Sequence, residues 1–276
     1  MPQIAGWNAR FCYLRRTELG HPSLDLSNKT AVVIGGTSGI GLALSRGLAA
    51  AGADVVPTGR REKLVQEAAE MIKKCGRQSL ARVCDVADNH QLEQLREAVL
   101  DKFGSVEILV NCAGRTKRMP TLDFPEAEWN SILDTNLNGT FRACKVFGRP
   151  MLERGYGRIV NVGSISSFVG VFEVAAYSAS KAGVVALTRS LAIEWAHKGV
   201  CVNALCPGVF RTNLNAALLD GTARGREFLM RTPMGRFGNV EELVGATVFL
   251  ASDAASFMTG QAVIVDGGLL ASGVNQ

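Results

Sequence analysis

The sequence predicts an α/β fold, a doubly wound parallel sheet of about seven strands with helices on both faces. From residue 29 onward, short runs rich in Val and Ile alternate with longer segments of helical periodicity. The apolar runs are continuous, as is typical of strands that are buried on both faces. No Pro- or Gly-rich linker interrupts the pattern. We therefore expect one domain at residues 29–276, preceded by an N-terminal extension at residues 1–28.

The elements alternate along the chain. Strands are expected at residues 30–34, 54–58, 80–84, 106–110, 158–162, 200–205 and 262–265. Helices are expected at residues 40–51, 62–74, 91–103, 129–153 and 176–197, the first two ending at Gly52 and Gly76. Right-handed crossovers between parallel strands place ligands beyond the carboxyl ends of the strands.

Composition excludes several classes of function. An apolar fraction of 47% and a charged fraction of 20% argue against disorder. The net charge of +5 is modest and the basic groups are scattered, so no nucleic-acid partner is expected. Three distant histidines predict no metal site, and no apolar run is long enough to span a membrane. Seven cysteines without a C-x-x-C motif indicate reduced thiols in a cytoplasmic protein.

A glycine-rich loop follows the first expected strand. Gly35, Gly39 and Gly41 allow a tight turn into a helix, with backbone N–H groups and the helix N-terminus facing a pyrophosphate. The loop lacks the lysine of a P-loop, which disfavours a nucleotide triphosphatase. It predicts a dinucleotide cofactor. The candidate ligands are Gly35, Thr37, Ser38, Gly39, Ile40 and Gly41.

The end of the second expected strand bears on the choice of cofactor. Gly59 stands where an enzyme that reads the ribose 2′-hydroxyl carries Asp or Glu, and Arg60 and Arg61 follow it. A guanidinium pairs with a 2′-phosphate, so NADP(H) is preferred over NAD(H), which stays possible, and Arg60 is the candidate ligand. Asp85 is a candidate acceptor for the adenine amino group, with a turn-forming role as the alternative.

Tyr177 and Lys181 lie four residues apart, on one face of an expected helix. A cation beside a phenol lowers its pKa toward the working range, which suits proton exchange with an alcohol or carbonyl oxygen. By itself such a pair is more often part of a solvated helix face. Its significance depends on the motifs around it.

Taken together, these residues resemble the short-chain dehydrogenase/reductase family over residues 29–268. In family order and spacing, the motifs are the glycine loop, Asp85-Val86, Asn111-Cys112-Ala113-Gly114, Asn136, Ser164, Tyr177-x-x-x-Lys181, Pro207-Gly208 with Thr212, and Asp266-Gly267-Gly268. Two departures, Ile34 in place of Thr and Cys112 in place of Asn, touch no reacting atom.

The resemblance implies a Rossmann-type fold and direct hydride transfer between a nicotinamide and a substrate carbon, with no metal. Tyr177 is expected to exchange a proton with the substrate oxygen, which Ser164 stabilises. Lys181 is expected to lower the pKa of Tyr177 and to bind the nicotinamide ribose, and Asn136 to hold a water of a proton relay. The other cofactor contacts implied are Asp85, Val86, Asn111, Ala113, Gly114, Pro207, Gly208, Val209 and Thr212.

The substrate is less well determined. Residues 124–129, 192–195, 211–218 and 231–236 resemble those of gluconate 5-dehydrogenases and related sugar-acid oxidoreductases, and Arg115, Lys117 and Arg118 offer partners for a carboxylate. The apolar stretch 168–172 favours the alternative, a 3-oxoacyl-carrier-protein reductase or another ketone reductase. A more remote alternative is a non-catalytic nucleotide-binding regulator, against which the intact Ser164, Tyr177 and Lys181 count.

Two expectations concern the periphery of the domain. Residues 209–235 are expected to form a mobile lid over a small-molecule substrate. The resemblance implies a homotetramer, built through the two long helices that flank the Ser164 strand and through the C-terminal end of the chain.

Overall fold

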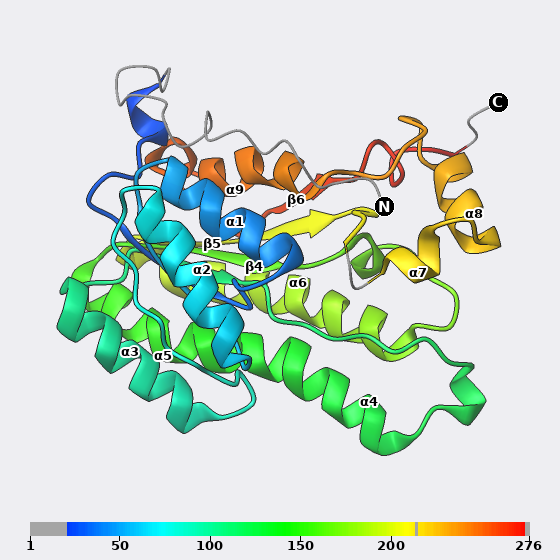
Figure 1. The fold of residues 1–276 in the computed structure, drawn as a ribbon, viewed down its shortest axis with the longest axis horizontal. Helices are drawn as coiled ribbons and strands as arrows, with labels where there is room; N and C mark the ends of the chain where they lie inside the picture. The colour runs from blue at the N-terminus through cyan, green and yellow to red at the C-terminus, as the bar shows by residue number, and fades with distance from the viewer. Residues whose placement is uncertain (1–20, 213–214, 274–276) are drawn as a thin grey trace.

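The computed structural model describes residues 21–212 and 215–273 (Figure 1). It contains one parallel sheet, in the strand order β2-β1-β3-β4-β5-β6. The strands are β1 (Thr30–Ile34), β2 (Asp54–Thr58), β3 (Ile108–Asn111), β4 (Gly157–Val162), β5 (Val200–Pro207) and β6 (Ala262–Val265). The predicted doubly wound α/β fold is confirmed. All strands run parallel, but the strand order reverses at β1, because β2 lies on one side of it and β3 on the other, and such switch points are where these sheets bind ligands.

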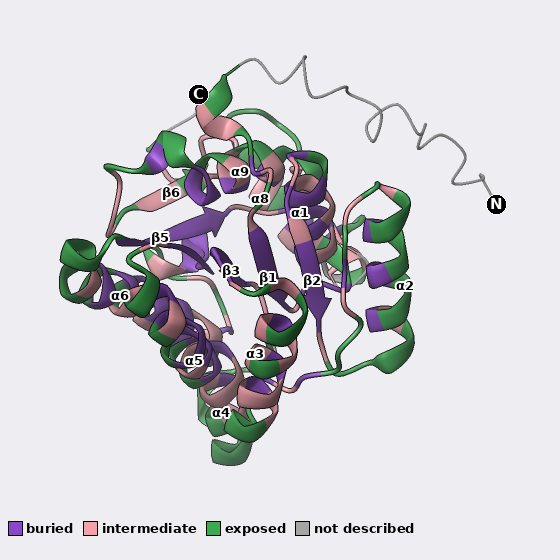
Figure 2. Cartoon of the chain, turned by 90° about the vertical axis from the view of Figure 1, so that its left-hand side faces the viewer, coloured by how far each residue is buried: buried purple, intermediate pink, exposed green. Residues whose placement is uncertain are grey.

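Helices cover both faces of the sheet (Figure 2). They are α1 (Gly39–Ala50), α2 (Glu62–Lys74), α3 (Asn89–Phe103), α4 (Glu126–Leu133), α5 (Gly139–Arg154), α6 (Ala175–Trp195), α7 (Ala216–Leu219), α8 (Ala223–Arg231) and α9 (Val244–Ala251). The alternation in β1 shows how the sheet divides the core. Ala31 and Val33 pack with residues of α1, α2 and α9, whereas Val32 and Ile34 pack with residues of α3, α5 and α6.

The strand predicted at residues 80–84 is absent, so the described residues form six strands and not seven. The segment still runs beside β2. The Val55 N–H donates to the Gln78 carbonyl at 3.1 Å, and the Cys84 N–H donates to the Gly59 carbonyl at 3.1 Å. Between these two bonds lies Pro57, which has no N–H to donate. Side chains take over there, because the Thr58 hydroxyl donates to the Arg82 carbonyl at 2.6 Å.

The long helix predicted at residues 129–153 begins earlier and is divided. A π-helical turn, Asp134–Asn138, separates α4 from α5. Such a turn inserts one extra residue into the helical ladder and frequently marks a functional site. Here it carries Asn136, whose side chain is fully buried.

The predicted extension at residues 1–28 lies mostly outside the described residues. In the described part, Leu26 is fully buried in the core beneath α1, and its N–H donates to the Ala51 carbonyl at 2.9 Å. Core packing therefore begins before residue 29. The predicted lid at residues 209–235 contains α7 and α8. The domain boundaries and the mobility of the lid remain predictions.

Candidate active site

The glycine loop forms a tight turn between β1 and α1. Gly35 has a φ of +79°, and a Cβ at Gly41 would lie 2.0 Å from the Gly35 carbonyl oxygen. Only glycine fits at either position. The loop brings the backbone of Gly36 to Gly39 to the start of α1, where free N–H groups favour an anion. The predicted loop residues Thr37, Ser38 and Ile40 all lie in this turn or the first turn of α1.

The arginines that follow β2 make different contacts. Arg60 is exposed, and its Nη1 lies 3.9 Å from Asp85 Oδ2. The Asp85 carboxylate also accepts a bond from the Ala87 N–H at 3.0 Å, so Asp85 forms a turn as well. Arg61 points to the glycine loop, where its Nη2 donates to the Ser38 hydroxyl at 3.1 Å. The predicted site includes Arg60 only. The doubled arginine directly after the strand was the signal for Arg61.

Residues that follow β3 and β5 pack next to the glycine loop. A Cβ at Gly35 would lie 2.6 Å from the Ala113 nitrogen, so the loop after β3 packs directly on the turn. A Cβ at Gly39 would lie 3.6 Å from Thr212 Cγ2, which places Thr212 on the other side. Pro207 ends β5, and the Gly208 N–H donates to the Val265 carbonyl at 2.8 Å. Val209 accepts a bond from the Gly238 N–H at 3.0 Å.

Asn111 ends β3 in a buried polar contact. Its Nδ2 donates to Asn161 Oδ1 at 2.8 Å and to Cys144 Sγ at 3.3 Å. Its Oδ1 is buried and has no hydrogen-bond partner among the described residues. Buried polar atoms of this kind are normally satisfied, so this oxygen is a free acceptor at the edge of the site. Val86, by contrast, packs against the start of α5, since a Cβ at Gly139 would lie 2.8 Å from Val86 Cγ1.

Asn136 ties the loop after β3 to α6. Its Oδ1 accepts a bond from the Arg115 N–H at 2.8 Å, and its Nδ2 donates to the Arg115 carbonyl at 2.9 Å and to the Ser180 hydroxyl at 3.0 Å. A Cβ at Gly114 would lie 3.4 Å from Asn136 Oδ1 and 3.6 Å from Lys181 Nζ. Asn136, Gly114 and Lys181 are thus neighbours, as the family spacing implies.

Ser164 and Tyr177 meet beyond the carboxyl end of β4. Ser164 caps a short 3₁₀ turn, Ile165–Ser167, and accepts a bond from the Ser166 N–H at 3.1 Å. Tyr177 lies in the first turn of α6, and its hydroxyl is hydrogen-bonded to Ser164. A serine hydroxyl beside a phenol is the arrangement that can hold an alcohol or carbonyl oxygen between them.

Burial raises the pKa of Tyr177, and the hydrogen bond with Ser164 opposes this rise. The direction is opposite to the expectation that Lys181 lowers it. Lys181 Nζ donates to the Val162 carbonyl at 2.7 Å and lies 5.8 Å from the centroid of the Tyr177 ring. The ammonium is itself buried, and burial lowers its pKa. Desolvation of the phenol therefore sets the direction of its pKa, and the Lys181 ammonium directs its hydrogen bond to the Val162 carbonyl.

Two thiols near this pair were not predicted. Cys112 and Cys206 lie close enough to Tyr177 and Lys181 to interact with both electrostatically. Burial raises the pKa of each thiol to about 11, so both are neutral at physiological pH. The departure of Cys112 from the family pattern was the available signal for the first. Nothing in the sequence marks the second.

The basic residues of the loop after Gly114 form ion pairs with two different glutamates. Arg115 forms an ion pair with Glu128 and donates to the Ser131 hydroxyl at 2.5 Å. Lys117 Nζ lies 4.0 Å from the same Glu128. Arg118 instead pairs with Glu173, with 2.7 Å between Nε and Oε2. Arg115 therefore fixes α4, whereas Arg118 lies next to the start of the helix that carries Tyr177.

The described residues fit a dinucleotide. The glycine turn, the exposed arginines after β2, the unpaired Asn111 Oδ1 and the Lys181 ammonium all lie at the carboxyl ends of the neighbouring strands β1 to β4. Within the described ranges, no group of three or more His, Cys, Asp or Glu residues is arranged to hold a metal ion. No helix in the same ranges has the length and apolar character required to cross a membrane.

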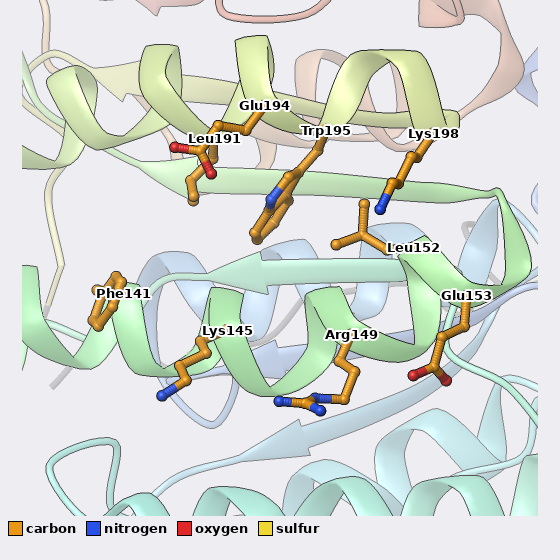
Figure 3. Close-up of a pocket in the computed structure, with 9 residues that line it drawn as sticks. All are labelled: Phe141, Lys145, Arg149, Leu152, Glu153, Leu191, Glu194, Trp195 and Lys198. Carbon is orange, nitrogen blue, oxygen red and sulfur yellow. The ribbon is translucent and has the colours of Figure 1, made fainter.

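A separate groove lies on the outer surface of α5 and α6 (Figure 3). Apolar side chains of Phe141, Leu152, Leu191 and Trp195 line it, and charged side chains of both signs surround them. The charged residues are Lys145, Arg149, Glu153, Glu194 and Lys198. None of the predicted catalytic or cofactor residues lines this groove.

The chain is similar in sequence and structure to several known proteins. Residues 35–270 match a family model described as Enoyl-(Acyl carrier protein) reductase. Gluconate 5-dehydrogenase of Gluconobacter oxydans is 38% identical over 92% of this chain and 100% of that protein. A 3-oxoacyl-[acyl-carrier-protein] reductase of Escherichia coli is 37% identical over 89% of this chain and 99% of its own length. A gluconate 5-dehydrogenase from Burkholderia cenocepacia, solved in complex with NADP and tartrate, superposes with a TM-score of 0.88 at 38% identity, covering 91% of this chain and 98% of that one.

Proposed function

Because the chain belongs to the short-chain dehydrogenase/reductase family, we propose that it is an NADP(H)-dependent oxidoreductase that interconverts a secondary alcohol and a ketone on a sugar acid. The observation that carries the proposal is the contact between the Ser164 and Tyr177 hydroxyls, next to a buried Lys181 at the edge of a glycine-loop sheet. A non-catalytic nucleotide-binding regulator would not require these three groups together.

When bound, the nicotinamide cofactor supplies or accepts the hydride. The glycine loop would hold its pyrophosphate, Arg60 and Arg61 its 2′-phosphate, and Asp85 its adenine. Thr212 and Gly208 on one side, and Ala113 and Gly114 on the other, would border it. Lys181 would bind the nicotinamide ribose. The arginines after β2 support NADP(H), which relatives of known structure contain.

The chain's own residues handle the proton. A phenol whose pKa is raised stays protonated at neutral pH, so Tyr177 is ready to donate its proton to a ketone oxygen. In the oxidative direction it must first lose that proton, which requires a higher pH. Ser164 holds the substrate oxygen as its negative charge develops. Lys181 and Asn136 link the site, through Gly114 and Ser180, to the loop after β3.

Two observations favour a sugar acid. Relatives named as gluconate 5-dehydrogenase and 2-dehydro-3-deoxy-D-gluconate 5-dehydrogenase are each 38% identical over more than nine-tenths of the chain. Arg118 places a guanidinium near the substrate side of the site. A second candidate, reduction of a 3-oxoacyl thioester, is supported by the E. coli relative and by the exposed Phe168, Val169 and Phe172, which offer an apolar surface.

The test is a substrate panel. NADP⁺ reduction would be followed with gluconate and other sugar acids, and NADPH oxidation with their keto acids and with acetoacetyl thioesters. We expect turnover with at least one sugar acid, and loss of that turnover in Tyr177→Phe with cofactor binding retained. Turnover of the thioester alone would establish the second candidate. Full activity in Tyr177→Phe would overturn the proposed chemistry.

We also propose that the protein is a cytoplasmic homotetramer. The groove between α5 and α6 supports one interface, because its apolar centre and mixed charges suit contact with a second copy. The half-exposed edge strand β6 supports the other. Six of the cysteines lie in the described ranges and none of these six is in a disulfide, which supports a reducing compartment. Light scattering at several protein concentrations tests the mass, and a monomer at each of them would contradict the tetramer.

A further inference from the structure

Three charged side chains from separate segments meet at the substrate side of the site. Arg118 lies in the loop after β3, Glu173 just before α6, and Arg224 on α8 of the predicted lid. Arg118 Nε donates to Glu173 Oε2 at 2.7 Å. The Arg224 guanidinium donates to the Phe172 carbonyl at 3.2 Å and interacts electrostatically with both Arg118 and Glu173. The lid, the basic loop and the catalytic helix are therefore joined by one cluster.

Glu173 is held in place by its backbone. Its φ is +61°, in the left-handed region that non-glycine residues seldom adopt. Its carbonyl accepts a bond from the Met119 N–H at 2.9 Å, next to Arg118 in sequence. A strained residue of this kind persists where the surroundings determine its position, and such residues gather at ligand-binding sites. The strain fixes the carboxylate against Arg118.

The cluster carries more positive than negative charge. Arg118 has Glu173 as its partner, whereas no carboxylate of the described residues lies within ion-pair distance of Arg224. The nearby Glu227 pairs with Arg231 at 3.1 Å. Burial and the proximity of Arg118 lower the pKa of Arg224, and the carboxylates of Glu173 and Glu227 offset this fall only in part. Arg118 and Arg224 carry two positive charges against the single negative charge of Glu173, so the cluster can bind a second carboxylate.

The cluster is within reach of the reacting atoms. Glu173 precedes Tyr177 by four residues at the start of α6. Arg118 follows Gly114, the neighbour of Lys181 Nζ, by four residues, so their Cα atoms are at most ~14 Å apart. The Arg118 guanidinium contacts Glu173, about one helical turn before Tyr177. A sugar acid whose alcohol carbon reaches Tyr177 can therefore extend its carboxylate toward Arg118.

We infer that the Glu173 carboxylate occupies Arg118 as an internal substitute for the substrate carboxylate, and that a sugar acid displaces it and binds between Arg118 and Arg224. This inference rests on the proposed sugar-acid function. Glu173 is then a specificity-determining residue that competes with the substrate. Arg224 adds a second guanidinium from the lid, so an anionic substrate also draws the lid toward the catalytic helix. A neutral polyol has nothing to exchange for Glu173.

The test compares Glu173→Gln with the unmodified enzyme. The glutamine amide oxygen still accepts a bond from Arg118, but the competing charge is gone. We expect KM for the sugar acid to fall about three- to tenfold, with kcat and KM for NADP⁺ unchanged. KM for the sugar alcohol of the same chain length should not change. Arg224→Gln should raise KM for the acid about tenfold and leave that for the alcohol unchanged.

The matched control is Glu97→Gln, which removes an equal charge from an exposed glutamate paired with Arg96 on α3. It should leave every constant unchanged. Unchanged KM for the acid in Glu173→Gln, with normal turnover of that acid, would overturn the inference and leave the proposed function intact. An equal fall of KM for the neutral alcohol would also overturn it, since the effect would then be steric. Failure of the unmodified enzyme to turn over any sugar acid would instead overturn the proposed function, and the inference with it.

Discussion

Replacing Asn136 by alanine would remove in one step the three hydrogen bonds of a buried side chain, one of them fully buried and two partly buried. The side chain is fully buried and bonds the Arg115 N–H, the Arg115 carbonyl and the Ser180 hydroxyl at 2.8 to 3.0 Å. Each such bond contributes about 1 kcal/mol net, and a buried backbone group left without a partner costs about 1–3 kcal/mol. We therefore expect the free energy of unfolding to fall by about 3 kcal/mol.

Asn138 provides a matched control in the same π-helical turn. It is exposed, and its Nδ2 makes one bond of 3.3 Å to Asp134 Oδ1. Asn138→Ala should change the free energy of unfolding by no more than about 0.5 kcal/mol. The two variants differ in burial and bonding but not in chemistry or local helix. Any difference between them therefore reports the buried contacts.

The assay is urea unfolding followed by tryptophan fluorescence, at one fixed protein concentration because association shifts apparent stability. Turnover would be measured on the same samples, since Asn136 also borders Gly114 and Lys181. If both variants unfolded at the same urea concentration, the structural argument would be refuted. If Asn136→Ala lost turnover without losing stability, the role of Asn136 would be limited to proton transfer.

Further predictions concern the catalytic helix and the cofactor. Tyr177→Phe should lower kcat at least ~100-fold while NADPH still binds, as followed by cofactor fluorescence. The oxidative rate should rise with pH, because the phenolate is required and burial raises the pKa of Tyr177. Lys181→Met removes the nearby cation and should move this rise to still higher pH, so an unchanged profile would count against coupling between the two residues. Arg60→Asp should lower the preference for NADPH over NADH roughly 10- to 100-fold in kcat/KM. Comparable kcat/KM for both cofactors in the unmodified enzyme would disprove the NADPH preference.

Most of the fold was predictable because its signals are local. The observed strands β1, β4 and β5 are rich in apolar residues and buried along their whole length, and the glycine loop marks the first crossover directly. The strand at residues 80–84 was predicted wrongly from its own composition. The deciding residue, Pro57, lies in the neighbouring strand, so pairing and not propensity decided the outcome. The π-helical turn was missed because it adds one residue without interrupting the apolar pattern.

The proximity of the main candidate residues was predictable, but their electrostatics were not. Spacing placed Ser164, Tyr177 and Lys181 together correctly. The direction of the Tyr177 pKa depends on how deeply the phenol is buried and on where the ammonium directs its bond, and both are tertiary properties. The same holds for Arg115, which looked available for a substrate and is occupied by Glu128 on a helix 13 residues further along the chain.

Pro57 interrupts the regular hydrogen bonding beside β2, so the β2 edge of the sheet differs from the β6 edge in its ability to pair with another strand. On the β2 margin, residues 78–84 cover β2 through irregular contacts, in which Ser79 Oγ donates to the Val55 carbonyl at 2.6 Å and Thr58 Oγ1 donates to that of Arg82. An incoming strand finds no regular row of donors and acceptors there, which guards against uncontrolled fibre-like growth. Growth by addition of strands is thereby confined to the β6 margin. If two copies pair through their β6 edges, both of these edges are used, so assembly by this contact alone stops at a dimer.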